Sequence, residues 1–390
     1  MNNKRLVFVG GAIDLLDNLS YELESAFKTL GYEALFFDAG KEIEAVRKLL
    51  EFAAKPVTAA IFFNQAGLFA SVQQGKNLWQ QLGIRCIDIL MDHPFCFPED
   101  FDRMSPDTIV LCPDKNHMRY VQRFYPHIQI TGFLPHWGRT QTHTTKKICE
   151  RSGSVIYLGG LSRSAIDKVM PDFSQFDFDA KLIADEALAY MLSHPCATTE
   201  DSIEKSLKNH GIIVDDNRLK NIIADLHYID LLAVSYFREK SIRLLVEAGI
   251  DVDIYGYGWE ICDWIENEHA HYKGRIPAQE CAAKMGEYKI VLNTLTWFKD
   301  GTHDRIFNGM LAGAVVVTDS SVYLKEEFAD NELIMFELND INSLPDIVKD
   351  LLSDEERMQQ IADAGYQKAE YAHSLLSRAK ELDAELLSLI

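Results

Sequence analysis

Short apolar runs, most of them rich in β-branched residues, recur along the chain and are separated by segments with helical spacing of apolar positions. In the first half the runs are Arg5–Val9, Glu33–Asp38, Thr58–Phe63, Ile84–Met91, Thr108–Cys112 and Gln129–Leu134. Continuous apolar runs of this length are typical of parallel strands that are covered on both faces. Their alternation with helices predicts a doubly wound α/β domain, in which ligands bind at the carboxyl ends of the strands.

The same pattern starts again at Ser154–Leu158, which ends in Gly159-Gly160 as the first strand ends in Gly10-Gly11. Residues from about 162 to 235 are helical in spacing and mixed in charge, and the α/β alternation resumes at Val252–Tyr255. We therefore predict one α/β domain over residues 1–150 and a second over residues 151–375, with a helical insertion at about 162–235. A terminal helix is expected over residues 376–390.

The stretch Asp300–Asp319 says most about function, because it predicts a loop, a helix, a glycine turn and a buried strand in succession. Thr302 is the expected N-cap of the helix, and Gly313 can adopt the left-handed conformation that closes it. A helix that begins at the carboxyl edge of a parallel sheet offers free amides to an anion. His303 and Arg305 lie in its first turn, and an arginine there can hold a phosphate with two bonds. A solvated Arg305 and a merely capping His303 fit the same residues equally well.

Two further places carry candidate chemistry. Glycine pairs after strands allow a ligand to approach the backbone, so Gly10 and Gly11, and Arg163 just after the second pair, are candidates; a tight turn and an exposed arginine are the alternatives. Asp92 and His93 follow the strand Ile84–Met91 and are the best-placed acid–base pair of the first half. Capping of the next turn by Asp92 explains the same residues without catalysis.

Composition narrows the class of protein. The 390 residues carry a net charge of −20, which argues against nucleic-acid binding. We interpret the basic stretch Arg139–Arg151 as a solvated linker. No signal peptide and no apolar run long enough to span a bilayer is visible, so we expect a cytoplasmic protein, with peripheral membrane contact left open. The seven cysteines form no C-x-x-C pair; we interpret them as core residues, in preference to a metal site of Cys96 with His93.

The order of motifs in the last third of the chain resembles a known family. The motifs are VDIYGYGWE, HYKGRIP, KIVLNT, GTHDRIFNGMLAGAVVVTD and ADAGYQKAEYAHSLLSRAKEL. Together they resemble the CgeB-like, spore-maturation-protein-like glycosyltransferases, which belong to the GT-B transferases related to glycosyltransferase family 4. The resemblance covers Tyr236–Leu382 well and the first half only in overall pattern.

This resemblance implies the GT-B fold: two Rossmann-like domains that face each other across a cleft, with the terminal helix packed back on the first. The second domain would bind a nucleotide-diphosphate-sugar, and the first a glycan, protein or other acceptor. Diphosphate charge would be met by amides and basic side chains, so neither a metal nor another cofactor is expected. The matching donor-binding positions are Gly256 and Trp259, Arg275 and Ile276 near the base, and Asp300, Gly301, Thr302, His303, Arg305 and Asn308 near the ribose, diphosphate and sugar. Asn308 replaces a glutamate common in relatives.

The leading hypothesis from the sequence is therefore a glycosyltransferase. If the transfer inverts the anomeric centre, Asp92 or His93 would be the base; if it retains the centre, both would position the acceptor. Two alternatives remain open. One is a sugar-nucleotide epimerase, and the other is a non-catalytic nucleotide-sugar-binding or protein-interaction module in which the helical insertion docks a partner.

Overall fold

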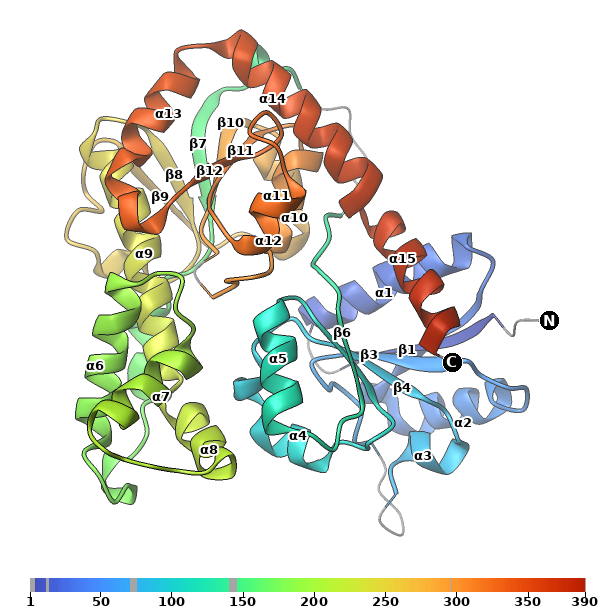
Figure 1. Cartoon of the computed structure of the whole chain (residues 1–390). Helices are drawn as coiled ribbons and strands as arrows, with labels where there is room; N and C mark the ends of the chain where they lie inside the picture. The colour runs from blue at the N-terminus through green and yellow to red at the C-terminus, as the bar shows by residue number, and fades with distance from the viewer. Residues whose placement is uncertain (1–3, 12–13, 71–75, 140–145, 296, 390) are drawn as a thin grey trace. The chain divides into compact units, whose positions relative to one another are not determined.

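A computed structural model describes residues 4–11, 14–70, 76–139, 146–295 and 297–389. The chain forms two compact units (Figure 1). Unit 1 comprises residues 1–136 and 372–390, and unit 2 comprises residues 137–371. Each unit is built on one six-stranded parallel sheet.

The sheet of unit 1 has the strand order β2-β1-β3-β4-β5-β6. Its strands are β1 Arg5–Gly10, β2 Glu33–Asp38, β3 Ala59–Phe63, β4 Cys86–Ile89, β5 Ile109–Cys112 and β6 Ile130–Phe133. The helices are α1 Asp14–Thr29, α2 Glu42–Phe52, α3 Leu78–Leu82, α4 Pro98–Arg103, α5 Lys115–Phe124 and α15 Leu375–Leu389. Strands β1, β3, β4 and β5 are buried throughout, which is why their residues are mostly apolar; Arg5 in β1 and Asp88 in β4 are the charged exceptions.

The terminal helix α15 belongs to unit 1, where it packs along α1 (Figure 1). Asp383 on α15 accepts a hydrogen bond from the Tyr32 hydroxyl and lies 3.6 Å from the Lys4 ammonium. Arg378, which is 3% exposed, donates to the carbonyl of His136. These contacts attach the end of the chain to a domain built from its beginning.

The sheet of unit 2 has the order β12-β11-β10-β7-β8-β9. Its strands are β7 Gly153–Leu158, β8 Val252–Tyr255, β9 Ala270–Gly274, β10 Tyr288–Asn293, β11 Val315–Asp319 and β12 Ile334–Phe336. The helices after the insertion are α10 Ala278–Met285, α11 Asp304–Leu311, α12 Val322–Glu327, α13 Leu344–Leu352 and α14 Glu355–Lys368. Numbered within the unit, the strand order is 3-2-1-4-5-6, and it reverses between β7 and β10. A reversal of this kind marks the ligand crevice of doubly wound sheets.

The predicted helical insertion consists of α6 Ala180–Ser193, α7 Thr199–Asn209, α8 Asp216–Leu226 and the first half of α9 Tyr228–Glu247. His227 separates α8 from α9, so two helices follow one another there without a loop. Helix α9 extends from the insertion to the sheet of unit 2 (Figure 1). Its side chains therefore contact both the insertion and the sheet region.

Two expectations about the chain need correction. Residues 140–145 of the predicted basic linker lie outside the described residues, but its last residue, Arg151, is 4% exposed and donates to the carbonyls of Tyr288 and Ala312, both at 2.8 Å. It therefore ties β10 to the end of α11 instead of being solvated. Among the cysteines, Cys86, Cys112 and Cys262 are buried as predicted, whereas Cys96, Cys149 and Cys196 are exposed.

Candidate functional site

The reversal point of the sheet in unit 2 brings together a glycine turn and the carboxyl ends of β7 and β10. Gly159-Gly160 follows β7, and Asn293 and Thr294 come at and just after the end of β10, where both are fully buried. Tyr157 on β7 has no exposed surface, and its hydroxyl lies 3.2 Å from that of Thr294. Polar groups at this edge of the sheet are therefore held in fixed positions.

Arg305 lies within this edge of the sheet, as the sequence predicted for a ligand-binding residue. It is 8% exposed, and its Nη1 donates to the side-chain oxygen of Asn293 at 2.6 Å. Its guanidinium carbon lies 5.4 Å from the centre of the Tyr157 ring. A Cβ atom at Gly159 would lie 3.1 Å from Nη2, so the arginine packs directly against the glycine turn. The interpretation of Arg305 as a solvated surface residue is excluded.

A second arginine, which the sequence did not single out, reaches the same turn. Arg238 on α9 donates from Nη1 to the carbonyl of Gly160 at 2.5 Å, and its guanidinium carbon lies 6.0 Å from the Tyr157 ring centre. Its Nε is buried and has no partner among the described residues. Arg238 lowers the pKa of both Arg305 and His303, after the larger effect of burial. Two like charges are thus held close together.

No carboxylate forms an ion pair with Arg238 or Arg305 within the described parts of the chain. Guanidinium groups stay protonated in proteins, and a buried uncompensated charge is costly. A pair of such groups beside a glycine turn is therefore chemically suited to an anion that supplies the missing negative charge.

Gly256 and Trp259 support the turn and do not line it. The indole N–H of Trp259 donates to the carbonyl of Gly159 at 2.8 Å, and the side chain has no exposed surface. Gly256 has a φ of +139°, and a Cβ there would lie 2.3 Å from the Gly159 carbonyl oxygen. Only glycine allows the loop after β8 to approach the loop after β7 so closely.

The start of α11 differs from the prediction in one residue. Thr302 is not the N-cap: the helix begins at Asp304, and His303 is the capping residue, with its Nδ1 accepting from the Arg305 N–H at 3.1 Å. Burial and the neighbouring Arg305 lower the pKa of His303, against the opposite effect of Asp304, whose carboxylate lies 2.7 Å from the same Nδ1. Thr302 has no exposed surface, and its hydroxyl has no hydrogen-bond partner among the described residues.

Asp300, Gly301 and Asn308 flank this helix start and are all buried. The carbonyl of Gly301 accepts from the Ser321 hydroxyl at 2.7 Å. The side-chain oxygen of Asn308 accepts from the Arg139 N–H at 2.9 Å, and its amide donates to Asp304 at 3.1 Å. The polar atoms of Asn308 are thus engaged within the unit.

Arg275 and Ile276 follow β9 and lie beside the loop after β8. Arg275 is exposed, and its guanidinium carbon lies 5.4 Å from the ring centre of Tyr257, which is itself 44% exposed. The Tyr257 ring also covers Gly160, where a Cβ would come within 2.5 Å of it. An exposed aromatic ring next to the glycine turn offers a surface on which a planar group can stack.

Arg163 does not join the buried Arg305 and the half-buried Arg238. It forms an ion pair with Glu239 at 3.0 Å, and 45% of its side-chain surface is exposed. Of the two alternatives that the sequence left open, an exposed arginine fits the structure better.

The first glycine pair has a different environment. The N–H of Gly11 donates to the Asp17 carboxylate at 2.7 Å, and a Cβ at Gly11, whose φ is +92°, would lie 2.3 Å from the Asp38 carboxylate. Carboxylates thus occupy the positions at which a phosphate would have to bind, and this speaks against Gly10 and Gly11 as donor-binding residues.

Asp92 and His93 lie in unit 1, just after β4. The Asn64 amide donates to Asp92 at 2.8 Å, and Asn64 and Gln65 at the end of β3 both have left-handed φ values, +46° and +58°. His93 is 5% exposed, and its Nδ1 accepts from the Phe95 N–H at 3.1 Å. His93, and not Asp92, therefore caps the 3₁₀ turn Pro94–Cys96. Strained residues of this kind cluster at functional sites.

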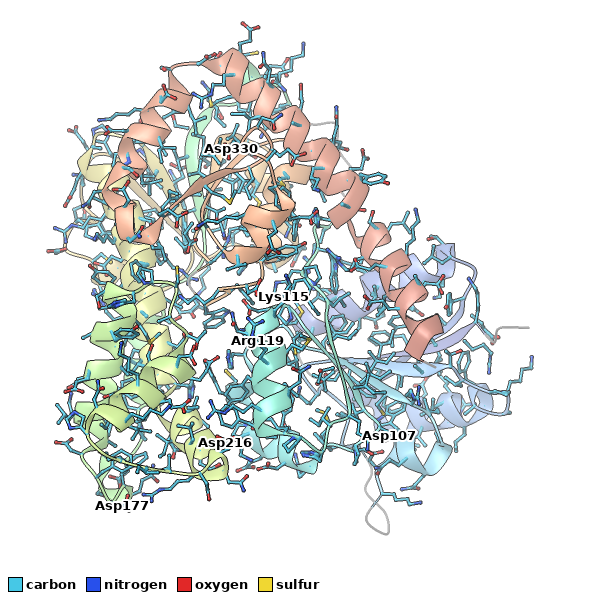
Figure 2. The ribbon with its side chains drawn as sticks, viewed as in Figure 1. Asp107, Lys115, Arg119, Asp177, Asp216 and Asp330 are labelled. Carbon is cyan, nitrogen blue, oxygen red and sulfur yellow. The ribbon has the colours of Figure 1, made fainter. Side chains whose placement is uncertain are left out.

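No group of three or more His, Cys, Asp or Glu side chains suited to a metal ion occurs among the described residues. Of the two Asp-x-Asp triplets, Asp177-Phe178-Asp179 lies in the insertion, far from the sheet of unit 2 (Figure 2), where Asp177 pairs with Arg218 and Asp179 caps α6. In the second, Asp251 accepts from His269 and Asp253 from Tyr288. Both triplets have structural partners within the protein.

Comparison with known proteins indicates the class of protein to which this site is similar. Residues 238–384 match the model of a family described as glycosyl transferase-like; this segment starts at Arg238 and includes Arg305. It covers less than half of the chain, and no curated protein matches the chain as a whole.

Solved structures match almost the whole length of the chain at low identity. T4 phage BGT in complex with UDP-glucose is 9% identical, with a TM-score of 0.53 over 98% of this chain and 99% of that one. Sucrose-phosphate synthase from Thermosynechococcus elongatus is 10% identical, with a TM-score of 0.52 and 99% coverage of both. Anabaena HepE in complex with UDP and glucose is 12% identical, with a TM-score of 0.51 over both chains in full.

These matches confirm the predicted fold: two Rossmann-like domains, as in GT-B glycosyltransferases. The family match bears out the predicted enzyme class, a glycosyltransferase, for the C-terminal part of the chain. No helix in the described part of the chain is long and apolar enough to cross a membrane.

Proposed function

We propose that the protein transfers a sugar from a nucleoside-diphosphate-sugar to a glycan, protein or other acceptor, and that the diphosphate binds at the Gly159-Gly160 turn. The observation that carries this proposal is the pair Arg238 and Arg305. Both guanidinium groups face the Tyr157 ring at the reversal point of the sheet, and neither has a carboxylate partner among the described residues. A diphosphate would balance their charge with charge-assisted hydrogen bonds.

The same groups suit the reaction itself. When the bond between the sugar and the diphosphate breaks, negative charge grows on the leaving oxygen, and fixed donors that are already in place stabilise it. Arg305 is held by Asn293 and Arg238 by the Gly160 carbonyl, so neither has to reorganise. The start of α11 adds the positive end of a helix dipole.

The base of the nucleotide is assigned to the exposed pair Tyr257 and Arg275, with Ile276 beside them. Its ring would stack on Tyr257, next to the Gly160 backbone. Trp259 and Gly256 are assigned a supporting role, because the first is fully buried and the second fills a contact between two loops. Gly10, Gly11 and Arg163 are left out of the donor site.

The acceptor is assigned to unit 1, with Asp92 as the residue that takes the proton of the attacking hydroxyl if the transfer inverts the anomeric centre. Asn64 fixes the Asp92 carboxylate. His93 is less suitable, because its Nδ1 already accepts a hydrogen bond and its side chain is buried. The proposal also includes that the protein belongs to the CgeB-like group, transfers the sugar without a metal ion and is located in the cytoplasm.

Titration calorimetry with a panel of nucleotide-sugars tests the donor site. We expect one donor to bind, and Arg305→Ala and Arg238→Ala each to weaken it by about 10- to 100-fold, since a lost charge-assisted hydrogen bond costs roughly 1.5–3 kcal/mol. Arg163→Ala is the matched control and should leave donor affinity unchanged. Slow hydrolysis of the bound donor, followed by product chromatography, would support transfer.

Three other outcomes would point elsewhere. Unchanged affinity in Arg238→Ala and Arg305→Ala would remove the diphosphate from this turn. Tight binding without hydrolysis or transfer to any acceptor would favour a non-catalytic module. Conversion of the donor into a sugar epimer would identify an epimerase.

A further inference from the structure

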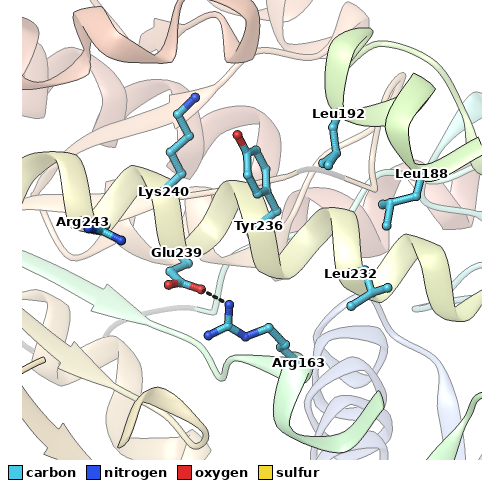
Figure 3. Close-up of a pocket in the computed structure, with 8 residues that line it drawn as sticks. All are labelled: Arg163, Leu188, Leu192, Leu232, Tyr236, Glu239, Lys240 and Arg243. Carbon is cyan, nitrogen blue, oxygen red and sulfur yellow. Dashed lines mark ion pairs between the residues drawn. The ribbon is translucent and has the colours of Figure 1, made fainter. Parts of the chain in front are cut away.

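A pocket of about 440 Å³ lies within unit 2, between the insertion and α9, and no role has been assigned to it (Figure 3). It is lined by Leu188 and Leu192 of α6, by Leu232, Tyr236, Glu239, Lys240 and Arg243 of α9, and by Arg163. Its volume is in the range of small-molecule sites, about 300–1,000 Å³. The lining divides into an apolar part and a charged part.

The apolar and the charged part of the lining are separated along the axis of α9. Leu232 and Tyr236 face the two leucines of α6 at one end, and Lys240 and Arg243 lie at the other (Figure 3). From Leu232 to Lys240 the helix rises by roughly 12 Å, at 1.5 Å per residue. A molecule that fills the pocket would therefore meet hydrocarbon at one end and cations at the other.

Among the charged residues, Lys240 is the one left to meet a ligand. Arg163 pairs with Glu239 at 3.0 Å and Arg243 with Glu247 at 2.6 Å. Glu239 also accepts from the Trp264 indole at 3.3 Å. No ion pair joins Lys240 to a carboxylate within the described residues; its ammonium lies 5.7 Å from the Tyr236 ring centre. The pocket thus offers an apolar wall and one available positive charge.

The pocket is separate from the proposed donor site although both use α9. Successive residues of an α-helix are rotated by about 100°, so Arg238 points away from the face formed by Leu232, Tyr236, Lys240 and Arg243. Arg238 contacts Gly160 on that other side. A ligand in the pocket would not occupy the space of a nucleotide.

We propose that this pocket binds a small amphipathic acid: an apolar chain with one anionic head, its chain against the leucines and Tyr236 and its head on Lys240. A membrane surface fits less well, because the insertion around the pocket contains more acidic than basic residues, and anionic bilayers attract basic segments. The occupant is therefore a single dissolved molecule.

Calorimetry of the full protein with decanoate, decanol and decylammonium tests the proposal. The three probes have the same alkyl chain and differ in the charge of the head group. Decanoate should bind about fivefold more tightly than decanol, the upper range for an ion pair that is partly exposed, and decylammonium more weakly than either. Lys240→Gln should remove the advantage of decanoate and leave decanol unchanged. Leu188→Asn should weaken both.

Lys208→Gln is the matched control, because Lys208 lies in the same insertion, is 69% exposed and pairs with Glu204. All variants are first compared by thermal unfolding, and decanol binding shows that Lys240→Gln keeps the pocket intact. Decanoate affinity that is unchanged in Lys240→Gln, equal binding of the three probes, or no binding would each overturn the proposal. Co-sedimentation with phosphatidylglycerol vesicles that depends on Lys240, without binding of dissolved decanoate, would overturn it in favour of a membrane surface.

Discussion

The two strands that open the two units end in the same way, in a pair of glycines, yet the surroundings of the pairs have opposite charge. At Gly159-Gly160 the nearest charged groups are Arg238 and Arg305. At Gly10-Gly11 they are Asp17 and Asp38. A glycine pair provides close approach to the backbone in both places, but only the charges around it decide what can approach. The second turn suits an anion, whereas at the first the carboxylates already lie against the backbone, and Lys41 pairs with Asp38 at 3.0 Å.

This difference assigns separate tasks to the two units. Unit 2 collects the cations that would neutralise a diphosphate, whereas unit 1 holds the Asp92 carboxylate just after β4. A transferase needs both kinds of group, one for the leaving group and one for the acceptor hydroxyl. Each unit can therefore be tested by a change that the other should ignore.

The largest effect is expected in unit 1 from Asp92→Asn. The amide keeps the hydrogen-bonding shape but cannot take a proton, so the transfer rate should fall by about 10²- to 10⁴-fold, the usual contribution of a general base. Donor affinity, measured by calorimetry, should not change. Asp107→Asn replaces an exposed carboxylate of the same unit and should keep full activity. Full activity in Asp92→Asn would end its assignment as the base.

An intermediate effect is expected from alanine at one glycine near each turn. In Gly256→Ala the new Cβ would meet the Gly159 carbonyl at 2.3 Å, and in Gly11→Ala it would meet the Asp38 carboxylate at 2.3 Å. Both positions have positive φ, so each variant should lose at least about 1–3 kcal/mol of unfolding free energy. Only Gly256→Ala should also weaken donor binding, because it displaces the turn to which we assign the diphosphate.

The control for this pair is Gly211→Ala, whose φ of +69° is strained but whose Cβ would meet nothing within 4 Å. It separates the cost of the backbone conformation from the cost of the clash. Equal loss of donor affinity in Gly256→Ala and Gly11→Ala would show that the second turn is not the donor site.

The strands were predictable because a parallel strand that is buried on both faces is apolar at most positions. Ala59–Phe63 and Val315–Asp319 are examples: the structure buries every residue in both, including Thr318 and Asp319 at the end of the second. The position of Arg305 was predictable for a related reason. A loop that follows one such strand and precedes a short helix has to lie at the carboxyl edge of the sheet.

Arg238 could not be found in this way, because its place beside Gly160 depends on how α9 packs on unit 2. One signal was present. Arg238 lies at helical spacing from Val234, Ile242 and Leu245, which are all buried, so it is a cation within an apolar stripe. At the first glycine pair the error was the opposite one: a binding role was predicted that the structure does not support. Gly10 and Gly11 matched a ligand-binding pattern, but Asp38, which excludes an anion there, lies on the next strand.

The last effect concerns pH, where stability changes by at most about 1.4 kcal/mol per pH unit, and it compares one titratable group of each unit. Burial raises the pKa of Asp88 from its usual value to about 7, against the smaller opposite effect of hydrogen bonds from Gln65. In unit 2, burial lowers the pKa of His303. A raised carboxyl pKa means that the folded state binds the proton more tightly than the unfolded state. A lowered histidine pKa means that the folded state binds it less tightly.

The two groups should therefore change stability in opposite directions. Between about pH 4 and pH 7, folded Asp88 holds a proton that unfolded Asp88 releases, so its contribution to stability is lost as the pH rises, by at most about 1.4 kcal/mol per pH unit. Denaturant unfolding of wild type and Asp88→Asn at several pH values in this window should show the difference between them grow in favour of the variant. Asp107→Asn should run parallel to wild type. His303→Asn, which keeps a capping side chain, should instead gain on wild type as the pH falls below about 6.5, where histidine starts to bind protons in the unfolded chain. A constant difference for Asp88→Asn across the window would mean that its carboxyl is ionised in the folded protein, and unit 1 would then hold one more buried negative charge.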